Sequence, residues 1–349
     1  MRPRLVGQPL TGHTGAILAM AFGPGGRTLA SGNDNGTIRL WNLPQTVLTG
    51  STAAINSVAF GPGGRALASG SSDGTVRLWD VADPARSRSV GRLLTGPGAV
   101  SAGSVAISPD GRTLASGGDY GGTPRLWDVA NPAHPRPLGQ PLASSVPATT
   151  SVAFASDGHM LASGDDGGTI HLWDVANRMR PRPLGPIRTS GMAAITSVAF
   201  SRDGHTLASS EYGGTVRLWD VANRMRPRPL GPPLTSGTAV IKSIAFSPDG
   251  HTLASASNDG TVHLWDVTNP VRPRPLGPSL TVSTVPVDWV AFSPDGHTLA
   301  TSSDDGTIRL WNLNVQYAIQ RICSAAGDLA PGQWNQYIPQ LRYQPSCVH

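Results

Sequence analysis

The chain has 349 residues, of which 39% are hydrophobic and only 14% charged, and its formal net charge is +5. Its 42 glycines and 31 prolines favour short strands and turns. No apolar run approaches the roughly eighteen residues of a membrane-spanning helix. The first residues are basic, but no apolar segment follows them, so we expect no secretory signal, no membrane contact and a cytoplasmic location.

Seven copies of one unit fill almost the whole chain. A Leu-Trp-(Asp/Asn) tripeptide marks each copy, and the later copies are 46 residues apart. The marker tryptophans are Trp41, Trp79, Trp127, Trp173, Trp219, Trp265 and Trp311. Length alone suggests two domains, but the repeat favours one large closed domain over residues 1–313.

Within each unit, apolar residues alternate with polar ones, and turns such as Pro-Asp-Gly separate runs of about five residues. In the first unit we expect strands at 17–22, 28–31 and 37–41, with turns at 23–27 and 33–36. The pattern therefore predicts an all-β fold of short antiparallel strands.

The segment LASGSSDGTVRLWDVA, residues 67–82, is similar to the consensus of the WD-repeat β-propellers, and it recurs over roughly residues 5–313. The resemblance implies a seven-bladed β-propeller. Each blade would be a four-stranded antiparallel sheet beside a central channel, and each sequence unit would begin with an outermost strand.

The two ends of the chain fit that offset. Residues 1–11 align without a gap on residues 225–235, whereas no outermost strand follows Trp311. We therefore expect residues 4–10 to complete the seventh blade and close the ring. Because Met1 aligns with Met179 and Met225, the start lies inside a repeat, as expected if an effector domain preceded it in a longer protein.

The resemblance also implies a structural polar network of His, Ser or Thr, Asp and Trp in each blade. Only the first unit has the His, and there Asn replaces the Asp. The turn Asp becomes Gly121, Gly167 and Gly213 in three other units, so we expect a broken network in most blades. The implied members are His13, Ser31, Asn35, Trp41, Ser69, Asp73, Trp79, Ser255, Asp259, Trp265, Asp305 and Trp311.

A Ser, a His and an acid are also the residue types of a nucleophilic triad. Because these positions recur structurally, we predict no catalytic residue and no enzyme. The turns at 257–260 and 303–306 lack the spaced ligands and terminal Glu of a calcium loop. The Gly-rich stretch 117–122 is not followed by Gly-Lys-(Ser/Thr). We therefore predict neither a metal nor a cofactor.

Arginine is concentrated in the linkers before the outermost strands, at residues 177–183 and 223–229. These linkers should lie on the same side as the turns between the first two strands, which carry Arg27, Arg65, Arg112, His159, His205, His251 and His297. The opposite side should carry Asp119, Asp165, Asp166, Glu211 and Asp304. The sequence thus predicts a disk with one basic face, although such arginines also serve simply to solvate exposed turns.

Beyond residue 313 the repeat stops, and residues 314–326 show helical spacing of apolar residues. We expect a short helix and an apolar tail, residues 314–349, packed on the propeller. Cys323 and Cys347 would form a disulfide only in an oxidising compartment. This segment resembles the end of propellers at the C-terminus of large bacterial signalling proteins.

The loops that enter the innermost strands differ most between the copies, which favours partner recognition. We therefore predict a monomeric, non-catalytic scaffold or sensor for a protein or peptide, as the C-terminal part of a bacterial signalling or regulatory protein. A nucleic-acid-binding disk is the alternative, and an enzyme with a site at the channel mouth is less favoured. The candidate partner-binding residues are Arg180, Arg182, Arg226, Arg228, Arg272, Arg274, Tyr120, Tyr212 and Trp289.

Overall fold

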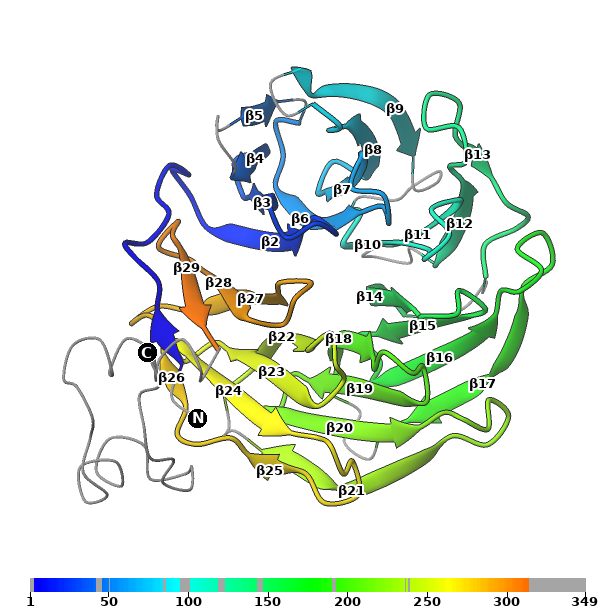
Figure 1. Ribbon diagram of the computed structural model, residues 1–349. Coiled ribbons are helices and arrows are strands. Elements are labelled where there is room, and N and C mark those ends of the chain that lie inside the picture. The colour runs from blue at the N-terminus through cyan, green and yellow to red at the C-terminus, as the bar shows by residue number, and fades with distance from the viewer. Residues whose placement is uncertain are drawn as a thin grey trace, which may run out of the picture.

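Seven sheets stand around a common axis in the computed structural model, and the strands of each sheet follow one another side by side from the centre to the rim (Figure 1). The structure describes residues 3–41, 46–49, 51–83, 86–94, 101–118, 123–142, 147–189, 193–235, 237 and 239–313. These residues form twenty-nine strands, and every pairing is antiparallel. The predicted seven-bladed all-β propeller is confirmed.

Each blade runs from an innermost strand to an outermost strand, and in blade 6 the outermost strand comes in two pieces that both pair with β24. The strands are β2 (Ile17–Phe22), β3 (Leu29–Asn33), β4 (Thr37–Trp41) and β5 (Thr46–Thr49) in blade 1; β6 (Ile55–Phe60), β7 (Ala66–Ser71), β8 (Thr75–Asp80) and β9 (Arg88–Leu94) in blade 2; β10 (Ser104–Ile107), β11 (Thr113–Gly117), β12 (Arg125–Asp128) and β13 (Arg136–Pro137) in blade 3; β14 (Thr149–Phe154), β15 (Met160–Asp165), β16 (Thr169–Asp174) and β17 (Arg182–Arg188) in blade 4; β18 (Ile195–Phe200), β19 (Thr206–Glu211), β20 (Thr215–Asp220) and β21 (Arg228–Thr235) in blade 5; β22 (Ile241–Phe246), β23 (Thr252–Ser257), β24 (Thr261–Asp266), β25 (Arg274–Pro275) and β26 (Leu280–Thr281) in blade 6; and β27 (Val287–Phe292), β28 (Thr298–Ser303), β29 (Ile308–Asn312) and β1 (Arg4–Leu5) in blade 7.

The N-terminal strand closes the ring, as predicted. In β1, Arg4 and Leu5 pair with Asn312 and Trp311 of β29, and Leu10 forms a further bridge with Ile308. Figure 1 shows this first strand beside the last one. The innermost strands β27 and β2 are also in contact, so the two ends of the repeat meet both at the centre and at the rim.

The core is divided into seven clusters, each between two adjacent blades. The third strand shows why: in β4, Ile38 and Leu40 are buried against blade 2, while Arg39 between them points to the other side of the sheet. The blades approach closely at Gly32, where a Cβ atom would lie 2.3 Å from Cγ2 of Ile55. Small residues at this position therefore allow the packing.

Serines on the innermost strands join most blades to the next. Each accepts a hydrogen bond from a backbone N–H of the following innermost strand, through Ser57, Ser104, Ser151, Ser197 and Ser243. In the equivalent position blade 1 has Ala19 and blade 7 has Trp289, and the junction of blades 7 and 1 instead has a bond from Ser302 Oγ to the carbonyl of Ile17. The closing junction is thus built differently from the others.

Two expectations need comment. The second strand of blade 1 is Leu29–Asn33 rather than 28–31, because Asn33 still pairs with Ile17 across a bulge. The predicted C-terminal helix, the tail and both cysteines lie outside the described residues. In the part of the chain that the structure describes, no helix is long and apolar enough to cross a membrane.

Candidate interaction surfaces

Backbone hydrogen bonds define two faces of the ring. We call the first one the linker face. There, the residue that follows the third strand donates a backbone hydrogen bond to the turn between the first two strands, as Val175 N–H does to the carbonyl of His159. On the second, the loop face, the other hairpin turn bonds to the loop before the innermost strand, as from Tyr212 to the carbonyl of Ala194. The predicted placement of the turns and linkers on one side is confirmed.

The linkers on the linker face are ordered turns. In blade 5, the side chain of Asn223 accepts a hydrogen bond from the N–H of Met225 at 3.2 Å, and its carbonyl accepts one from the N–H of Arg226 at 2.9 Å. The linkers of blades 3, 4 and 6 repeat this arrangement from Asn131, Asn177 and Asn269. An Asx turn of this kind fixes the direction of the residues at its tip.

Three consecutive linkers present a large apolar side chain to solvent. The exposed fractions are 59% for Met179, 68% for Met225 and 52% for Val271. Blade 3 has Ala133 at the same position. Sequence reasoning singled out the arginines and missed these residues, although their recurrence before an Arg in three successive repeats is a readable signal.

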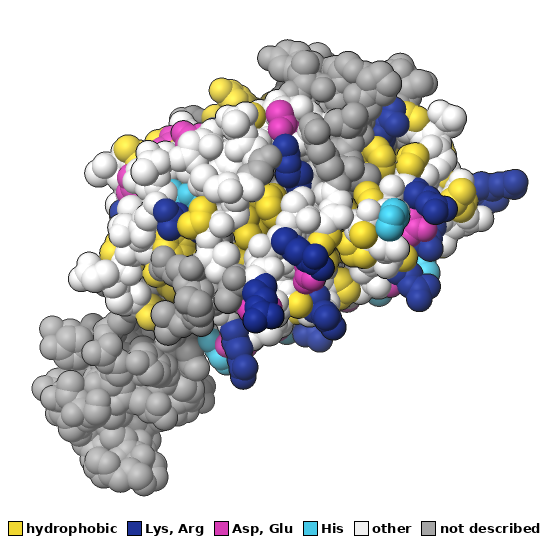
Figure 2. Space-filling model, turned by 90° about the horizontal axis from the view of Figure 1, so that it is seen from above, with side chains coloured by type: hydrophobic (Ala, Val, Ile, Leu, Met, Phe, Trp, Pro, Cys, Tyr) yellow, Lys and Arg dark blue, Asp and Glu magenta, His cyan; other side chains and the backbone are white. Residues whose placement is uncertain are grey.

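An exposed arginine follows each of these apolar residues, and none of the three forms an ion pair with a described residue. We call the six residues the apolar–arginine array: Met179, Arg180, Met225, Arg226, Val271 and Arg272. Figure 2 shows many of the Lys and Arg side chains gathered toward one edge of the molecule.

The other predicted arginines differ in their contacts. Arg228 forms an ion pair with Asp220 at 2.8 Å, and its hydrogen bond, followed by that from the N–H of Ala222, lowers the pKa of Asp220. Arg182 and Arg274 are exposed and lie opposite Asp174 and Asp266 in the sheet. Both arginines lie two residues after an arginine of the array, but each has an aspartate as its partner on the neighbouring strand.

Two further arginines, not singled out from the sequence, tie the linkers to the preceding blade. Arg224 forms an ion pair with Asp157 of blade 4 at 2.6 Å, and Arg178 reaches Asp128 of blade 3 at 3.5 Å. The linkers of blades 4 and 5 are therefore each held against the preceding blade.

The predicted aromatic candidates do not join this surface. Tyr212 is 63% exposed but lies on the loop face. Trp289 is half-buried and packs against the core between blades 7 and 1. Tyr120 lies outside the described residues.

Every blade contains one invariant element of the polar network. The indole Nε1 of its marker tryptophan donates a hydrogen bond of 2.7 to 3.2 Å to a hydroxyl of the second strand. The pairs are Trp41–Ser31, Trp79–Ser69, Trp127–Ser116, Trp173–Ser163, Trp219–Ser209, Trp265–Ser255 and Trp311–Thr301.

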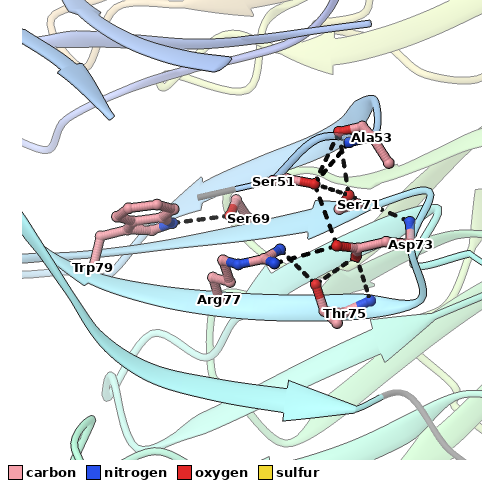
Figure 3. A network of polar contacts seen from close by, with 8 residues as sticks. All are labelled: Ser51, Ala53, Ser69, Ser71, Asp73, Thr75, Arg77 and Trp79. Atoms are coloured by element: carbon pink, nitrogen blue, oxygen red, sulfur yellow. Dashed lines mark hydrogen bonds and ion pairs between the residues drawn. The ribbon is translucent and has the colours of Figure 1, made fainter. Parts of the chain in front are cut away.

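Blade 2 extends this element with a charged group (Figure 3). The carboxylate of Asp73 accepts hydrogen bonds from the N–H and hydroxyl of Thr75 at 3.0 and 2.5 Å, and from Arg77 at 3.2 Å. Ser51 adds a longer bond of 3.3 Å and contacts Ser71 at 2.8 Å. Burial alone would raise the pKa of Asp73, but the hydrogen bonds from Thr75 and the charge of Arg77 lower it.

Asp305 in blade 7 repeats the arrangement, with Thr307 at 2.6 Å and Arg309 at 2.9 Å. In blade 6, Asp259 accepts a hydrogen bond of 2.7 Å from the hydroxyl of Thr261. The turn aspartates therefore hold the start of the third strand, rather than bonding to a histidine as in the implied network.

Blade 1 is neutral where these blades are charged. Nε2 of His13 lies 2.7 Å from Oγ of Ser31, and its Nδ1 lies 3.4 Å from the hydroxyl of Thr37. The hydroxyl of Thr37 in turn lies 2.9 Å from the side-chain carbonyls of both Asn33 and Asn35, which share its single proton. Asn35 therefore reaches His13 only through Thr37. Burial first, and the charge of Arg39 second, lower the pKa of His13 to about 4, so it is neutral at pH 7.

Two blades with Gly in the turn place an acid at the end of the second strand instead. Asp165 accepts a hydrogen bond from His171 at 3.0 Å in blade 4, and Glu211 pairs with Arg217 at 2.9 Å in blade 5. Both acids lie beside the loop-face turn, on the side where we expected them, but their side chains are only 2% and 5% exposed and so contribute little to the charge of that surface. Each is turned inward to face a basic residue of the third strand.

The seven innermost strands carry only two charged residues, Lys242 and Asp288. Nζ of Lys242 lies 4.0 Å from Oδ1 of Asp288. Burial, and then the nearby carboxylate of Asp304, raise the pKa of Asp288 to about 8. Among the described residues, no three His, Cys, Asp or Glu side chains cluster closely enough to hold a metal ion.

Comparison with known proteins agrees with the geometry. A family model described as "WD domain, G-beta repeat" matches the chain seven times, at residues 4–42, 43–80, 89–128, 142–174, 185–220, 231–266 and 278–312. These matches together cover more than half of the chain, and they follow the seven blades. A search of curated proteins found no significant match.

Proposed function

Since the chain belongs to the WD-repeat family, whose propellers generally mediate protein–protein interactions, we propose that it is a non-catalytic scaffold that binds a protein partner with its apolar–arginine array. One observation carries this proposal. Three consecutive blades each hold, on an ordered turn, an exposed large apolar side chain beside an arginine that forms no ion pair within the described structure.

The energetics of such a surface favour a protein interface. Burying a Met or Val side chain in a complex is worth about 1.5 to 3 kcal/mol. Methionine adapts its shape to a partner, and arginine is over-represented among the residues that dominate binding energy. Because the turns are already ordered in the free chain, little conformational entropy is lost when they bind.

A groove adjoins the array. It has a volume of about 440 Å³, lies between the turns of blades 5 and 6, and is lined by Arg202, Phe246, His251 and Pro270 among others. Pro270 directly precedes Val271 of the array. We expect an apolar side chain of the partner to enter this groove, with carboxylates of the same partner facing the arginines.

The charge pattern favours protein over nucleic acid. Aspartates such as Asp128, Asp157 and Asp220 lie on the linker face among the arginines. They would repel a continuous phosphate backbone but complement a protein surface of mixed charge. The proposal further includes a monomer acting in the cytoplasm as the C-terminal part of a bacterial signalling protein, which is supported by the resemblance of residues 314–349 to such proteins.

The first test compares partner recovery by matched arginine variants. The chain and the variant Arg180→Gln/Arg226→Gln/Arg272→Gln would each be used to capture proteins from lysate of the source cells. We expect at least one protein to be recovered about tenfold less with the triple variant, because one lost ion pair or desolvated contact is worth 1 to 2 kcal/mol. The control, Arg27→Gln/Arg65→Gln, removes exposed charges from the same face outside the array.

Titration of a DNA duplex at two salt concentrations distinguishes the alternative. We expect weak binding that is lost near physiological salt, with the same fall in affinity for both arginine variants. Tight DNA binding that only the array variant loses would replace the proposed protein partner with nucleic acid. Equal protein recovery by the wild type and the array variant would refute the proposed interface.

A further inference from the structure

The third strand of every blade carries a basic residue at one equivalent position, and in four blades that residue forms an ion pair with an acid of its own blade. The position is defined by its pairing with the serine or threonine that accepts the tryptophan bond, as Arg77 pairs with Ser69 in the sheet. The resulting contacts are Arg77–Asp73 at 3.2 Å, His171–Asp165 at 3.0 Å, Arg217–Glu211 at 2.9 Å and Arg309–Asp305 at 2.9 Å.

Blade 1 keeps the cation but has neither acid. Arg39 pairs with Ser31 in the sheet, which makes it the equivalent of Arg77. Asn35 stands where blade 2 has Asp73, and Asn33 stands where blade 5 has Glu211. Arg39 makes no ion pair with a described residue, and its Nε is buried without a hydrogen-bond partner.

The two asparagines cannot supply the missing acceptor. The side-chain carbonyl of Asn33 already accepts bonds from the N–H and hydroxyl of Thr37 at 3.0 and 2.9 Å. This fixes the orientation of the amide, because a flipped Asn33 would place NH₂ against the N–H of Thr37. The amide of Asn35 is likewise held, since its Nδ2 donates to Thr14 at 2.7 Å.

A second buried donor lies at the same place. Nδ2 of Asn33 is shielded from solvent and has no hydrogen-bond partner among the described residues. In blades 4 and 5 the residues equivalent to Asn33 and Arg39 form an ion pair, as Glu211 and Arg217 do. The side chains of Asn33 and Arg39 are therefore directed toward each other. Leaving a buried donor without an acceptor destabilises the folded chain, and blade 1 has two such donors among its described residues.

We propose that Arg39 and Asn33 form a binding site for a carboxylate that comes from outside the blade. Such a carboxylate would accept one hydrogen bond from each buried donor and would pair with the guanidinium. A carboxylate is the matching anion, because a carboxylate of this chain pairs with the equivalent basic residue in blades 2, 4, 5 and 7. A larger phosphate has no such precedent in the structure.

The surroundings leave the positive charge available. Arg39 is half-buried, and its guanidinium lies against Gly12, where a Cβ atom would be 3.1 Å from Cζ. Gly12 belongs to the loop before β2, so the guanidinium lies on the loop-face side of blade 1, away from the apolar–arginine array. His13 beside it is neutral at pH 7 because its pKa is lowered to about 4, so it adds no competing charge. This site is therefore separate from the proposed protein-binding surface.

The test uses the arginine side chains as reporters. The Nε–Hε resonances of the ¹⁵N-labelled chain would be followed by NMR during titration with potassium acetate, with ionic strength held constant by potassium chloride. We expect a saturable shift of the Arg39 signal, identified by its loss in Arg39→Gln, and no saturable shift of the Arg77 signal, since Arg77 already has its carboxylate.

Two variants that supply an internal carboxylate make the test decisive. Asn35→Asp recreates the arrangement of blade 2, and Asn33→Asp recreates that of blade 4. Either one should weaken the acetate response of Arg39 at least about tenfold, because a tethered carboxylate acts at an effective concentration in the millimolar range or above. Absence of a saturable Arg39 shift, an equal shift in both variants, or tighter binding of inorganic phosphate than of acetate would overturn the proposal. None of these outcomes bears on the array.

Discussion

Blades 1 and 2 have the same strands and the same Trp–Ser hydrogen bond, yet they stabilise the start of the third strand in different ways. Blade 2 uses the carboxylate of Asp73, which joins Thr75 to Arg77. Blade 1 uses the neutral amides of Asn33 and Asn35 together with His13. The comparison teaches that the charge around the third strand varies without changing the fold, and that blade 1 thereby retains a cation with no ion-pair partner among the described residues.

The largest expected difference between the two blades concerns acid. His13 has a pKa of about 4 in the folded chain against 6.5 in the unfolded chain, so the unfolded state binds a proton first as the pH falls. The stability present above pH 6.5 should therefore be lost as the pH falls from 6.5 to 4, by about 1 to 3 kcal/mol. His13→Ser, which brings in the residue type of Ser51, should flatten this part of a urea-denaturation profile. An unchanged profile would place His13 in solvent.

Truncation of the histidine tests its hydrogen bonds. His13→Ala removes the bond to Ser31 and leaves the hydroxyl of Thr37 with one partner fewer, so we expect a loss of about 1 to 3 kcal/mol at pH 7. Ser51→Ala in blade 2 should cost less, about 0.5 to 1.5 kcal/mol, because Asp73 keeps its bonds to Thr75. Chemical denaturation of both variants measures the difference. Equal losses would show that the two positions contribute alike.

Converting blade 2 to the chemistry of blade 1 should have a smaller effect. Asp73→Asn removes the ion pair with Arg77 but keeps an acceptor for Thr75, so the expected loss is about 1 kcal/mol. Because the pKa of Asp73 is lowered in the folded chain, this loss should shrink as the pH falls below the range where the carboxylate ionises. A loss that does not change between pH 7 and pH 3 would argue against a charge effect.

The repeat predicted the fold well because each Leu-Trp-(Asp/Asn) unit specifies one blade, and the alignment of residues 1–11 on an internal outermost strand predicted the closure by β1. The polar details were harder to predict. Glu211 and Arg217 lie six residues apart across a tight turn, and only the strand register shows that they meet inside the blade. Likewise, the exposure of Met225 depends on the turn made by Asn223, which the apolar character of methionine does not reveal.

The most direct test of the central claim, that Arg39 has no carboxylate partner in the part of the chain that the structure describes, is a double-mutant cycle in blade 1. The free energy of unfolding would be measured for the wild type, Asn35→Asp, Arg39→Gln and the double variant. We predict that Asn35→Asp stabilises the chain by about 0.5 to 1 kcal/mol when Arg39 is present and not when it is replaced. If Asn35→Asp had the same effect in both backgrounds, Arg39 would already be neutralised and the account of blade 1 would be contradicted.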